Sequence, residues 1–197
     1  MNTKKLVARA KHTEINGKKE ITGYDALYFT IEGSEICLWL GQAKAGQKNY
    51  CKTSIVEDLQ EKYKKDYFAD TAFYIADRNE AKELENLLEE INKICYLTQV
   101  KKWNSNQKFD KLVDVLKNNR VKLKIPCLIS YTKDIYIDKN RLKQFINAEI
   151  NDIISEFDTK VFPIDVGLDY EIVFYILPVK DVDYIRNKIV ELKREVV

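Results

Sequence analysis

The sequence is poor in glycine, proline and long apolar runs. It has 197 residues, of which only six are glycine and three are proline, and this argues against long disordered linkers. No apolar run approaches the roughly 20 residues that a membrane-spanning helix needs. The first residues, MNTKKLVARAKHTE, are basic but lack the apolar core of a signal peptide. We therefore expect an intracellular, cytoplasmic protein with no membrane partner.

Residues that bind soft metals are also scarce. The single histidine, His12, lies in a polar stretch, and the four cysteines form no C-x-x-C pair. A structural zinc site is therefore not expected. We expect His12 to be exposed and the cysteines to be reduced and packed as small hydrophobic side chains. The cysteines are Cys37, Cys51, Cys95 and Cys127.

Apolar and charged residues are both well represented. Hydrophobic residues make up 45% of the chain, which is enough for a sizeable core, and the length favours one domain over residues 1–197. Charged residues make up 32% and nearly cancel, at a net charge of +2. This balance neither requires nor excludes a nucleic-acid partner, because a local basic patch is compatible with it.

Apolar periodicity predicts an α/β protein. Strands are expected over 5–10, 24–31, 35–44, 121–131 and 170–179. Helices are expected from Ser54 onward and around 84–95, 109–116, 142–157 and 185–192. The resulting order, β-β-β-α-α-α-β-α-β-α, alternates strands and helices in its second half, as α/β folds do.

A few local signals refine these boundaries. Ser54 and Asp77 are each followed three residues later by glutamate, which predicts a capping box at each position. Asp181 is expected to cap the last helix. Pro126 lacks a backbone N–H, so the strand that contains it is expected to be irregular or near an edge.

The stretch LWLGQAKAGQKNY has the outline of a phosphate-binding loop. Gly41 and Gly46 have the spacing of G-x-x-x-x-G-K-[ST]. However, Gln47 stands where the lysine is needed, Lys48 comes one residue late, and Asn49 replaces the magnesium-binding hydroxyl. The apolar run also continues toward residue 44. We therefore interpret this stretch as a strand and not as a nucleotide-binding loop.

A hairpin explains the polar end of that strand. If Gly33-Ser34 is the turn, Asp25 lies directly opposite Gln42, with Cβ atoms about 4.5–5.5 Å apart. Lys44 follows two residues later and points to the same face. Burying an acid, an amide and a lysine together is unfavourable unless they pair or bind something.

Two interpretations of this trio are open. In the first, Asp25 forms a structural ion pair with Lys44, and Gln42 only ends the strand. In the second, the oxygens of Asp25 and Gln42 bind Mg²⁺ or Mn²⁺, and Lys44 stabilises charge on a phosphate. The second arrangement has the parts needed to hydrolyse a phosphodiester.

The trio resembles the motif of the PD-(D/E)XK nuclease superfamily. Gly23-Tyr24-Asp25 stands for the first part of the motif, and Gln42-Ala43-Lys44 for the second. The segments GYDALYF, LWLGQAK, IPCLISY and FYILPVKD occur in an order similar to that of the nuclease subunit of the Hachiman anti-phage defence system. This similarity extends over nearly the whole chain.

The resemblance implies a restriction-endonuclease-like fold, a mixed sheet flanked by helices in a single domain. It implies a metal-dependent nuclease that cuts DNA beside a superfamily 2 helicase, with Mg²⁺ or Mn²⁺ as cofactor. Asp25, Gln42 and Lys44 would be the catalytic residues, and Asp25 and Gln42 the metal ligands.

The chain departs from the family pattern in two respects. Gln42 stands where glutamate is usual, which brings no charge to the metal, although some nucleases of the wider superfamily use Gln-x-Lys. The family also has a helix before the first strand that contributes another acidic residue, whereas this chain begins almost at that strand. A shortened relative, a fragment and a subunit completed by a partner are the open interpretations. The alternative is therefore an attenuated or inactive nuclease-fold subunit that binds nucleic acid or protein.

Four further lysines are candidates for contact with nucleic acid. Lys48 and Lys52 follow the trio, and solvated surface lysines are the alternative. Lys101 and Lys102 lie beside Trp103 in an expected loop. This cluster could stack on a single strand, and plain anchoring of the loop is the alternative.

Overall fold

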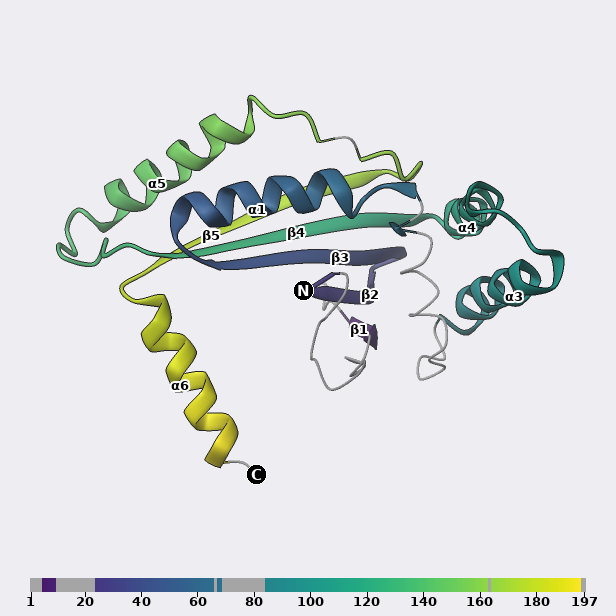
Figure 1. The fold of residues 1–197 in the computed structure, drawn as a ribbon, viewed down its shortest axis with the longest axis horizontal. Coiled ribbons are helices and arrows are strands. Elements are labelled where there is room, and N and C mark those ends of the chain that lie inside the picture. Colours follow the sequence, from purple (N-terminus) through teal and green to yellow (C-terminus); the bar gives the residue numbers. More distant parts are fainter. Residues whose placement is uncertain (1–4, 10–23, 66, 69–83, 163, 196–197) are drawn as a thin grey trace. The chain divides into compact units, whose positions relative to one another are not determined.

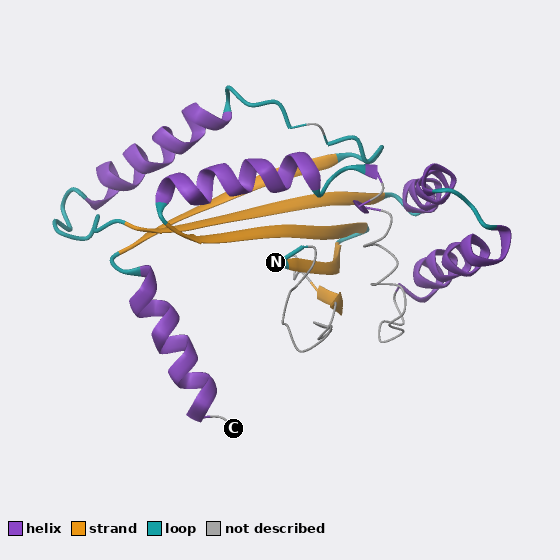
Figure 2. Ribbon diagram, in the orientation of Figure 1, coloured by secondary structure: helices purple, strands orange, loops and turns teal. Residues whose placement is uncertain are grey.

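The computed structural model describes residues 5–9, 24–65, 67–68, 84–162 and 164–195 (Figures 1 and 2). Its strands are β1 (Lys5–Arg9), β2 (Ala26–Glu32), β3 (Glu35–Gly46), β4 (Val121–Thr132) and β5 (Tyr170–Val179). Its helices are α1 (Lys48–Glu61), α3 (Glu85–Lys101), α4 (Ser105–Asn118), α5 (Leu142–Phe157) and α6 (Val182–Glu195). Their order confirms the predicted α/β succession.

The strands form one sheet in the order β1-β2-β3-β4-β5. The first two pairs are antiparallel. Between β4 and β5, the N–H of Leu123 donates to Asp169 O (2.9 Å) and the N–H of Lys133 donates to Val179 O (2.8 Å). The partners advance in step along both strands, so this pair is parallel. The mixed sheet with its helices confirms the predicted fold class and is consistent with a restriction-endonuclease-like fold.

The hairpin of β2 and β3 has the predicted register. Leu27 pairs with Leu40, and the ladder runs from Ala26↔Gly41 to Glu32↔Glu35. Gly33 has φ 67°, a left-handed conformation that suits glycine in a two-residue turn. β3 continues to Gly46 without a break, so the predicted strand in place of a phosphate loop is confirmed.

The chain divides into two compact units. The first comprises Met1–Gln42, Asp58–Pro126 and Pro163–Val173, and the second comprises Ala43–Glu57, Cys127–Phe162 and Phe174–Val197. β3, β4 and β5 contribute residues to both. The single domain expected over residues 1–197 stays a prediction.

In the first unit, α3 and α4 pack against each other. The Asn119 side chain donates to Glu90 Oε2 (2.9 Å), and the Phe68 and Phe109 rings meet edge to face at 6.1 Å. A capping box of Asn104 and Gln107 starts α4. The sequence carries this signal at the usual spacing of three residues, but hydrophobic periodicity alone does not reveal it.

In the second unit, α1 and α5 lie against the sheet. The Cys51 thiol donates to Ser130 O of β4 (3.5 Å), and the rings of Phe157 and Phe174 are 4.7 Å apart. Cys37, Cys51 and Cys127 are buried thiols, as expected. His12 and the side chain of Cys95 lie outside the described residues.

Pro126 does not lie near an edge of the sheet, so this alternative of the prediction is wrong. It lies in β4, between β3 and β5, and not at an edge. A Cβ on Gly41 of β3 would lie only 2.8 Å from Pro126 Cγ. The central strand therefore accommodates proline because its neighbour has no side chain at the point of contact.

One predicted helix start is also wrong. α1 begins at Lys48, so Ser54 lies inside the helix and forms no capping box at its start. α5 has the predicted range, but Ile146 and Ile154 on it are exposed, whereas Glu149 is buried. Hydrophobic periodicity does not reveal a buried glutamate. The capping box expected at Asp77 lies outside the described residues.

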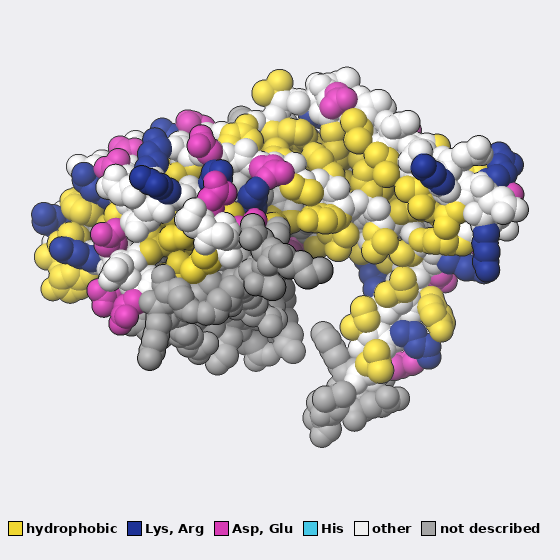
Figure 3. Space-filling view, turned by 180° about the vertical axis from the view of Figure 1, so that it is seen from behind, with side chains coloured by type: hydrophobic (Ala, Val, Ile, Leu, Met, Phe, Trp, Pro, Cys, Tyr) yellow, Lys and Arg dark blue, Asp and Glu magenta, His cyan; other side chains and the backbone are white. Residues whose placement is uncertain are grey.

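α6 (Val182–Glu195) contains the predicted helix around 185–192 and extends beyond it at both ends, and it has an exposed apolar face. Asp181 accepts a hydrogen bond from the N–H of Tyr184 (3.0 Å), which confirms it as the cap. Ile185, Ile189 and Leu192 are 42%, 49% and 59% exposed, and Figure 3 shows apolar side chains on this helix at the lower right. Across the described ranges, no helix is long and apolar enough to cross a membrane.

Candidate functional site

The hairpin places Asp25 at the very end of the paired ladder. The last ladder pair is Ala26↔Gly41, and Asp25 precedes it with its N–H donating to Gly41 O (2.9 Å). Asp25 is exposed, whereas Gln42 is only 2% exposed. The predicted pair of opposite residues, Asp25 and Gln42, is therefore the next position after the last regular pair of the β2–β3 ladder.

Gln42 already has a partner for its carbonyl oxygen. Lys62 Nζ donates to Gln42 Oε1 at 2.9 Å and also pairs with Asp58 Oδ1 at 3.1 Å. Since an ammonium group can only donate, the amide must turn its oxygen toward Lys62. Within the described part of the chain, the buried Nε2 of Gln42 has no hydrogen-bond partner.

Tyrosines fix the backbone on both sides of this contact. The Tyr24 hydroxyl donates to Lys62 O (2.5 Å), and the Tyr63 hydroxyl donates to Leu40 O of β3 (2.7 Å). The Tyr24 ring also meets Tyr63 edge to face, with centroids 5.1 Å apart. The strand that carries Gln42 and the segment that carries Lys62 are thus held together.

Asp25 and Asp58 act on the same phenol. Burial raises the pKa of Tyr67, and the negative charges of Asp58 and Asp25 raise it further. The Tyr67 ring contacts Tyr24 edge to face at 5.7 Å. The first unit thus gathers two carboxylates, an amide and an ammonium around one tyrosine pair. Sequence reasoning missed Asp58 and Lys62, although their i, i+4 spacing was a visible signal.

Lys44 belongs to the second unit. It is partly buried on β3, and its charge, together with that of Arg186, opposes the burial that raises the pKa of Cys51. Arg186 donates to Ala45 O (2.5 Å). Strand alternation puts Lys44 on the same face of β3 as Gln42. The convergence of Lys44 with Asp25 stays a prediction.

Lys48 and Lys52 are held by carboxylates of α5. Lys48 Nζ lies 2.7 Å from Glu149 and 2.5 Å from Asp152, and Lys52 pairs with Glu156. These acids follow a helical spacing, so they form one row along α5. Any contact of these lysines with a phosphate would have to compete with this row.

Glu149 is the buried centre of that row. Besides Lys48, it accepts hydrogen bonds from Lys133 and from the Tyr131 hydroxyl (2.6 Å). Burial alone raises the pKa of this carboxyl, but the bonds from Lys133, Lys48 and Tyr131 lower it to about 2. A buried glutamate with three donors is therefore ionised at neutral pH.

Lys101 ends a helix, whereas Lys102 and Trp103 lie in the turn after it, so the expected loop is confirmed only for these two. Lys101 is the last residue of α3, and Lys102 is its C-cap, with φ 52°. Both lysines are exposed, and Lys101 Nζ lies 5.7 Å from the centre of the Trp103 ring. The ring that stacks on a base in one of the two interpretations thus already contacts a lysine.

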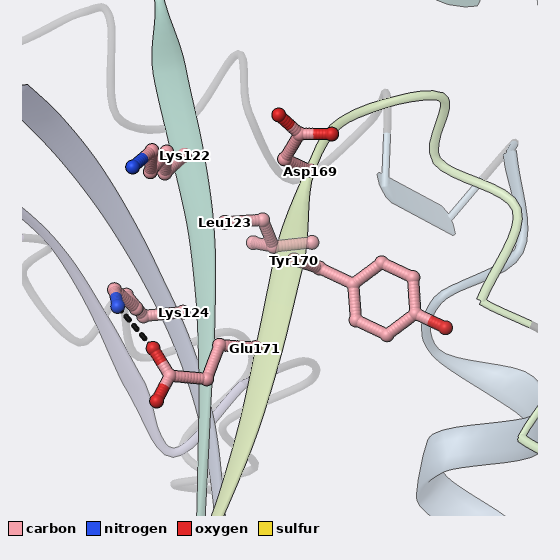
Figure 4. A pocket seen from close by; sticks show the side chains of 6 residues that line it. All are labelled: Lys122, Leu123, Lys124, Asp169, Tyr170 and Glu171. Atoms are coloured by element: carbon pink, nitrogen blue, oxygen red, sulfur yellow. Dashed lines mark hydrogen bonds and ion pairs between the residues drawn. The ribbon is translucent and has the colours of Figure 1, made fainter.

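A hollow of about 270 Å³ lies at the starts of β4 and β5, and Figure 4 shows the side chains that line it. Its two lysines are paired: Lys122 with Glu35 at 2.5 Å, and Lys124 with Glu171, as the dashed line shows. Both positive charges of the hollow are therefore already matched by carboxylates.

Of the two predicted metal ligands, Asp25 and Gln42, only one is available to a divalent ion in this structure. The Asp25 carboxylate is exposed and of the right chemistry, but the Gln42 oxygen faces an ammonium. Across the described residues, no three His, Cys, Asp or Glu side chains are grouped so that they could hold a metal. With Lys62 in this position, the Gln42 oxygen is not available to a divalent ion, and of this pair only Asp25 offers a suitable ligand.

The chain is similar to a known protein family over nearly its whole length. A model of the HamA family matches residues 9–192. No curated protein and no solved structure matches the chain.

Proposed function

Because the chain belongs to the HamA family, whose members are components of Hachiman anti-phage defence, we propose that it hydrolyses DNA phosphodiesters in that defence. The observation that carries the proposal is the end of the β2–β3 hairpin. Its register brings Asp25 beside Gly41 and Gln42, and Lys44 follows on the same face of β3.

The proposed roles follow from the chemistry of these residues. The exposed Asp25 carboxylate suits a hard cation, and Mg²⁺ or Mn²⁺ is the proposed cofactor. Such an ion, when bound, polarises a phosphoryl oxygen and lowers the pKa of water. Lys44 carries a fixed positive charge, which would stabilise negative charge on the phosphate. Gln42 is a ligand only if Lys62 releases its oxygen.

DNA and a superfamily 2 helicase are the proposed partners. Contact with DNA would be made chiefly to phosphates, through Lys44 and, after competition with α5, through Lys48 and Lys52. The exposed Lys101 and Lys102 are a second pair of lysines proposed to contact DNA phosphates. Binding through phosphates is sequence-independent and weakens as salt rises.

A specific observation favours a second candidate function. The hydrogen bond from Lys62 to Gln42 Oε1 engages the oxygen expected to bind metal. A nuclease-fold subunit that binds nucleic acid or protein without cutting is consistent with this contact. Cleavage assays on native and variant protein separate the two functions.

The test is degradation of plasmid and linear DNA with Mg²⁺ or Mn²⁺, in the presence of the helicase partner. Lys44→Ala should abolish cleavage because it removes a charge and leaves the core intact. Gln42→Glu should lower the metal concentration needed, since a carboxylate holds the ion more strongly than an amide. Lys64→Ala is the matched control, because Lys64 is exposed and pairs with Glu61.

The outcomes are distinct. If neither the native protein nor Gln42→Glu cuts DNA while both are folded, the binding-subunit function replaces the enzyme. If cutting occurs and survives Lys44→Ala, the enzyme stands but the site is wrong. Lys64→Ala should cut as the native protein does in either case.

A further inference from the structure

The contact between Lys62 and Gln42 has the form of an occupied cation site. Lys62 Nζ lies 2.9 Å from Gln42 Oε1 and 3.1 Å from Asp58 Oδ1. The side chains are largely removed from water: Gln42 is 2% exposed, and those of Lys62 and Asp58 are 21% and 15% exposed. Two oxygens, one neutral and one charged, thus converge on a single positive charge.

We infer that Lys62 is a positioning residue whose ammonium stands where a divalent cation would bind between Gln42 and Asp58, so that Lys62 and the cation compete for this place. The inference rests on the proposed function only in treating Gln42 as a residue of the site. It adds Asp58 and Lys62 to that site, which neither the motif nor the family match assigns.

The orientation of the Gln42 amide supports this assignment. Its oxygen faces Lys62, and within the described residues its buried Nε2 has no acceptor. A buried donor without a partner costs roughly 1–3 kcal/mol. The amide thus keeps its oxygen toward the Lys62 ammonium although its nitrogen stays unpaired, the same orientation that a bound cation would require.

The charges around the contact support it as well. Asp25 and Asp58 both raise the pKa of Tyr67, so two carboxylates share this neighbourhood with one ammonium. Removing the Lys62 charge would leave the oxygens of Asp58 and Gln42 that now contact it, which are the kinds of ligand that Mg²⁺ and Mn²⁺ take. With Lys62 present, its charge repels the ion.

The backbone positions explain why Lys62 reaches this place. The Lys62 N–H donates to Asp58 O (2.9 Å), which continues the helical pattern beyond α1. Tyr24 holds the carbonyl of Lys62, and Tyr63 holds β3 at Leu40. The lysine is thus fixed at its base, and only its side chain needs to move for the cation to enter.

The test measures binding of Mn²⁺ alone, by the loss of the free-ion signal in electron paramagnetic resonance. Lys62→Met removes the ammonium and keeps most of the aliphatic stem. It should bind Mn²⁺ at least about tenfold more tightly than the native protein, because a repelling charge a few ångströms away is gone. Asp58→Asn in the Lys62→Met background should reverse the gain. Lys64→Met, at an exposed lysine, should bind as the native protein does.

An equal Mn²⁺ affinity of folded Lys62→Met and native protein overturns the inference. If Lys62→Met does not fold, Lys62→Gln takes its place and is judged in the same way, since it keeps a donor for Gln42 without the charge. The readout needs no cleavage. Tighter Mn²⁺ binding without any DNA cutting would leave the inference intact and reject the nuclease. If DNA cutting depends on Lys44 but Lys62→Met binds Mn²⁺ no more tightly than the native protein, the nuclease stands and the inference about Lys62 is rejected.

Discussion

The buried carboxylate of Glu149 makes the stability of the second unit depend on acid. Its pKa is about 2 in the folded protein, against an ordinary value of 4.5. Because the folded value is the lower one, the stabilisation is fully present above pH 4.5 and is lost as the pH falls toward 2. At about 1.4 kcal/mol for each pH unit between the two values, it amounts to roughly 3 kcal/mol.

Glu149→Gln removes the charge but keeps the shape of the side chain. We expect the free energy of unfolding at neutral pH to fall by about 2–3 kcal/mol, because Lys48, Lys133 and Tyr131 lose a charged acceptor. The variant should also lose the steep decline of stability below pH 4.5. Urea unfolding followed by far-UV circular dichroism, repeated from neutral pH to about pH 3, measures both effects.

Glu191→Gln is the control. Glu191 pairs with Lys188 at 2.6 Å on the surface of α6, so its loss should change the free energy of unfolding by no more than about 0.5 kcal/mol. The reasoning about Glu149 is refuted if Glu149→Gln is as stable as the native protein and keeps the same dependence on pH.

Three further predictions concern the sheet and the lysines. Gly41→Ala should lower the free energy of unfolding by about 1–3 kcal/mol, because its Cβ would lie 2.8 Å from Pro126 Cγ; an unchanged melting curve by circular dichroism would count against the close contact. Glu156→Gln should raise DNA affinity about two- to threefold at low salt if Lys52, its partner, contacts phosphates; fluorescence anisotropy with labelled DNA measures this, and no gain would remove Lys52 from the interface. In the same assay, with the proposed helicase partner present, affinity should drop steeply between about 50 and 200 mM salt, and a flat response would exclude binding through phosphates.

The order of elements and the hairpin register were predictable because both depend on local patterns. The two-residue turn at Gly33-Ser34 alone determines which residues of β2 and β3 are opposite, and the structure has that register. Helix and strand periods extend over a few residues and need no knowledge of the rest of the chain. This is also why Asp181 was identified correctly as a cap.

The main errors involve partners far apart in sequence. Pro126 is central because Gly41 leaves room for it, and no pattern within β4 contains that information. Glu149 is buried because Lys48 and Lys133 reach it from other elements. Likewise, Lys62 follows the last residue of α1 and donates a hydrogen bond to Gln42 of β3, 20 residues earlier in the chain. Polar residues that are buried by long-range pairing cannot be recognised from hydrophobic periodicity.

The position of β4 in the sheet has a consequence for how the protein is made. β2 and β3 form a hairpin that is complete early in the chain, but the neighbour of β3 on its other side is β4, which ends only at Thr132. Until β4 has been synthesised, one edge of β3 therefore has no hydrogen-bonded neighbour, and apolar residues such as Leu38 and Leu40 are not yet buried. Long-range pairing of this kind forms slowly, and open apolar edges associate with other chains. Nascent chains of this protein should thus depend on chaperones until β4 has left the ribosome.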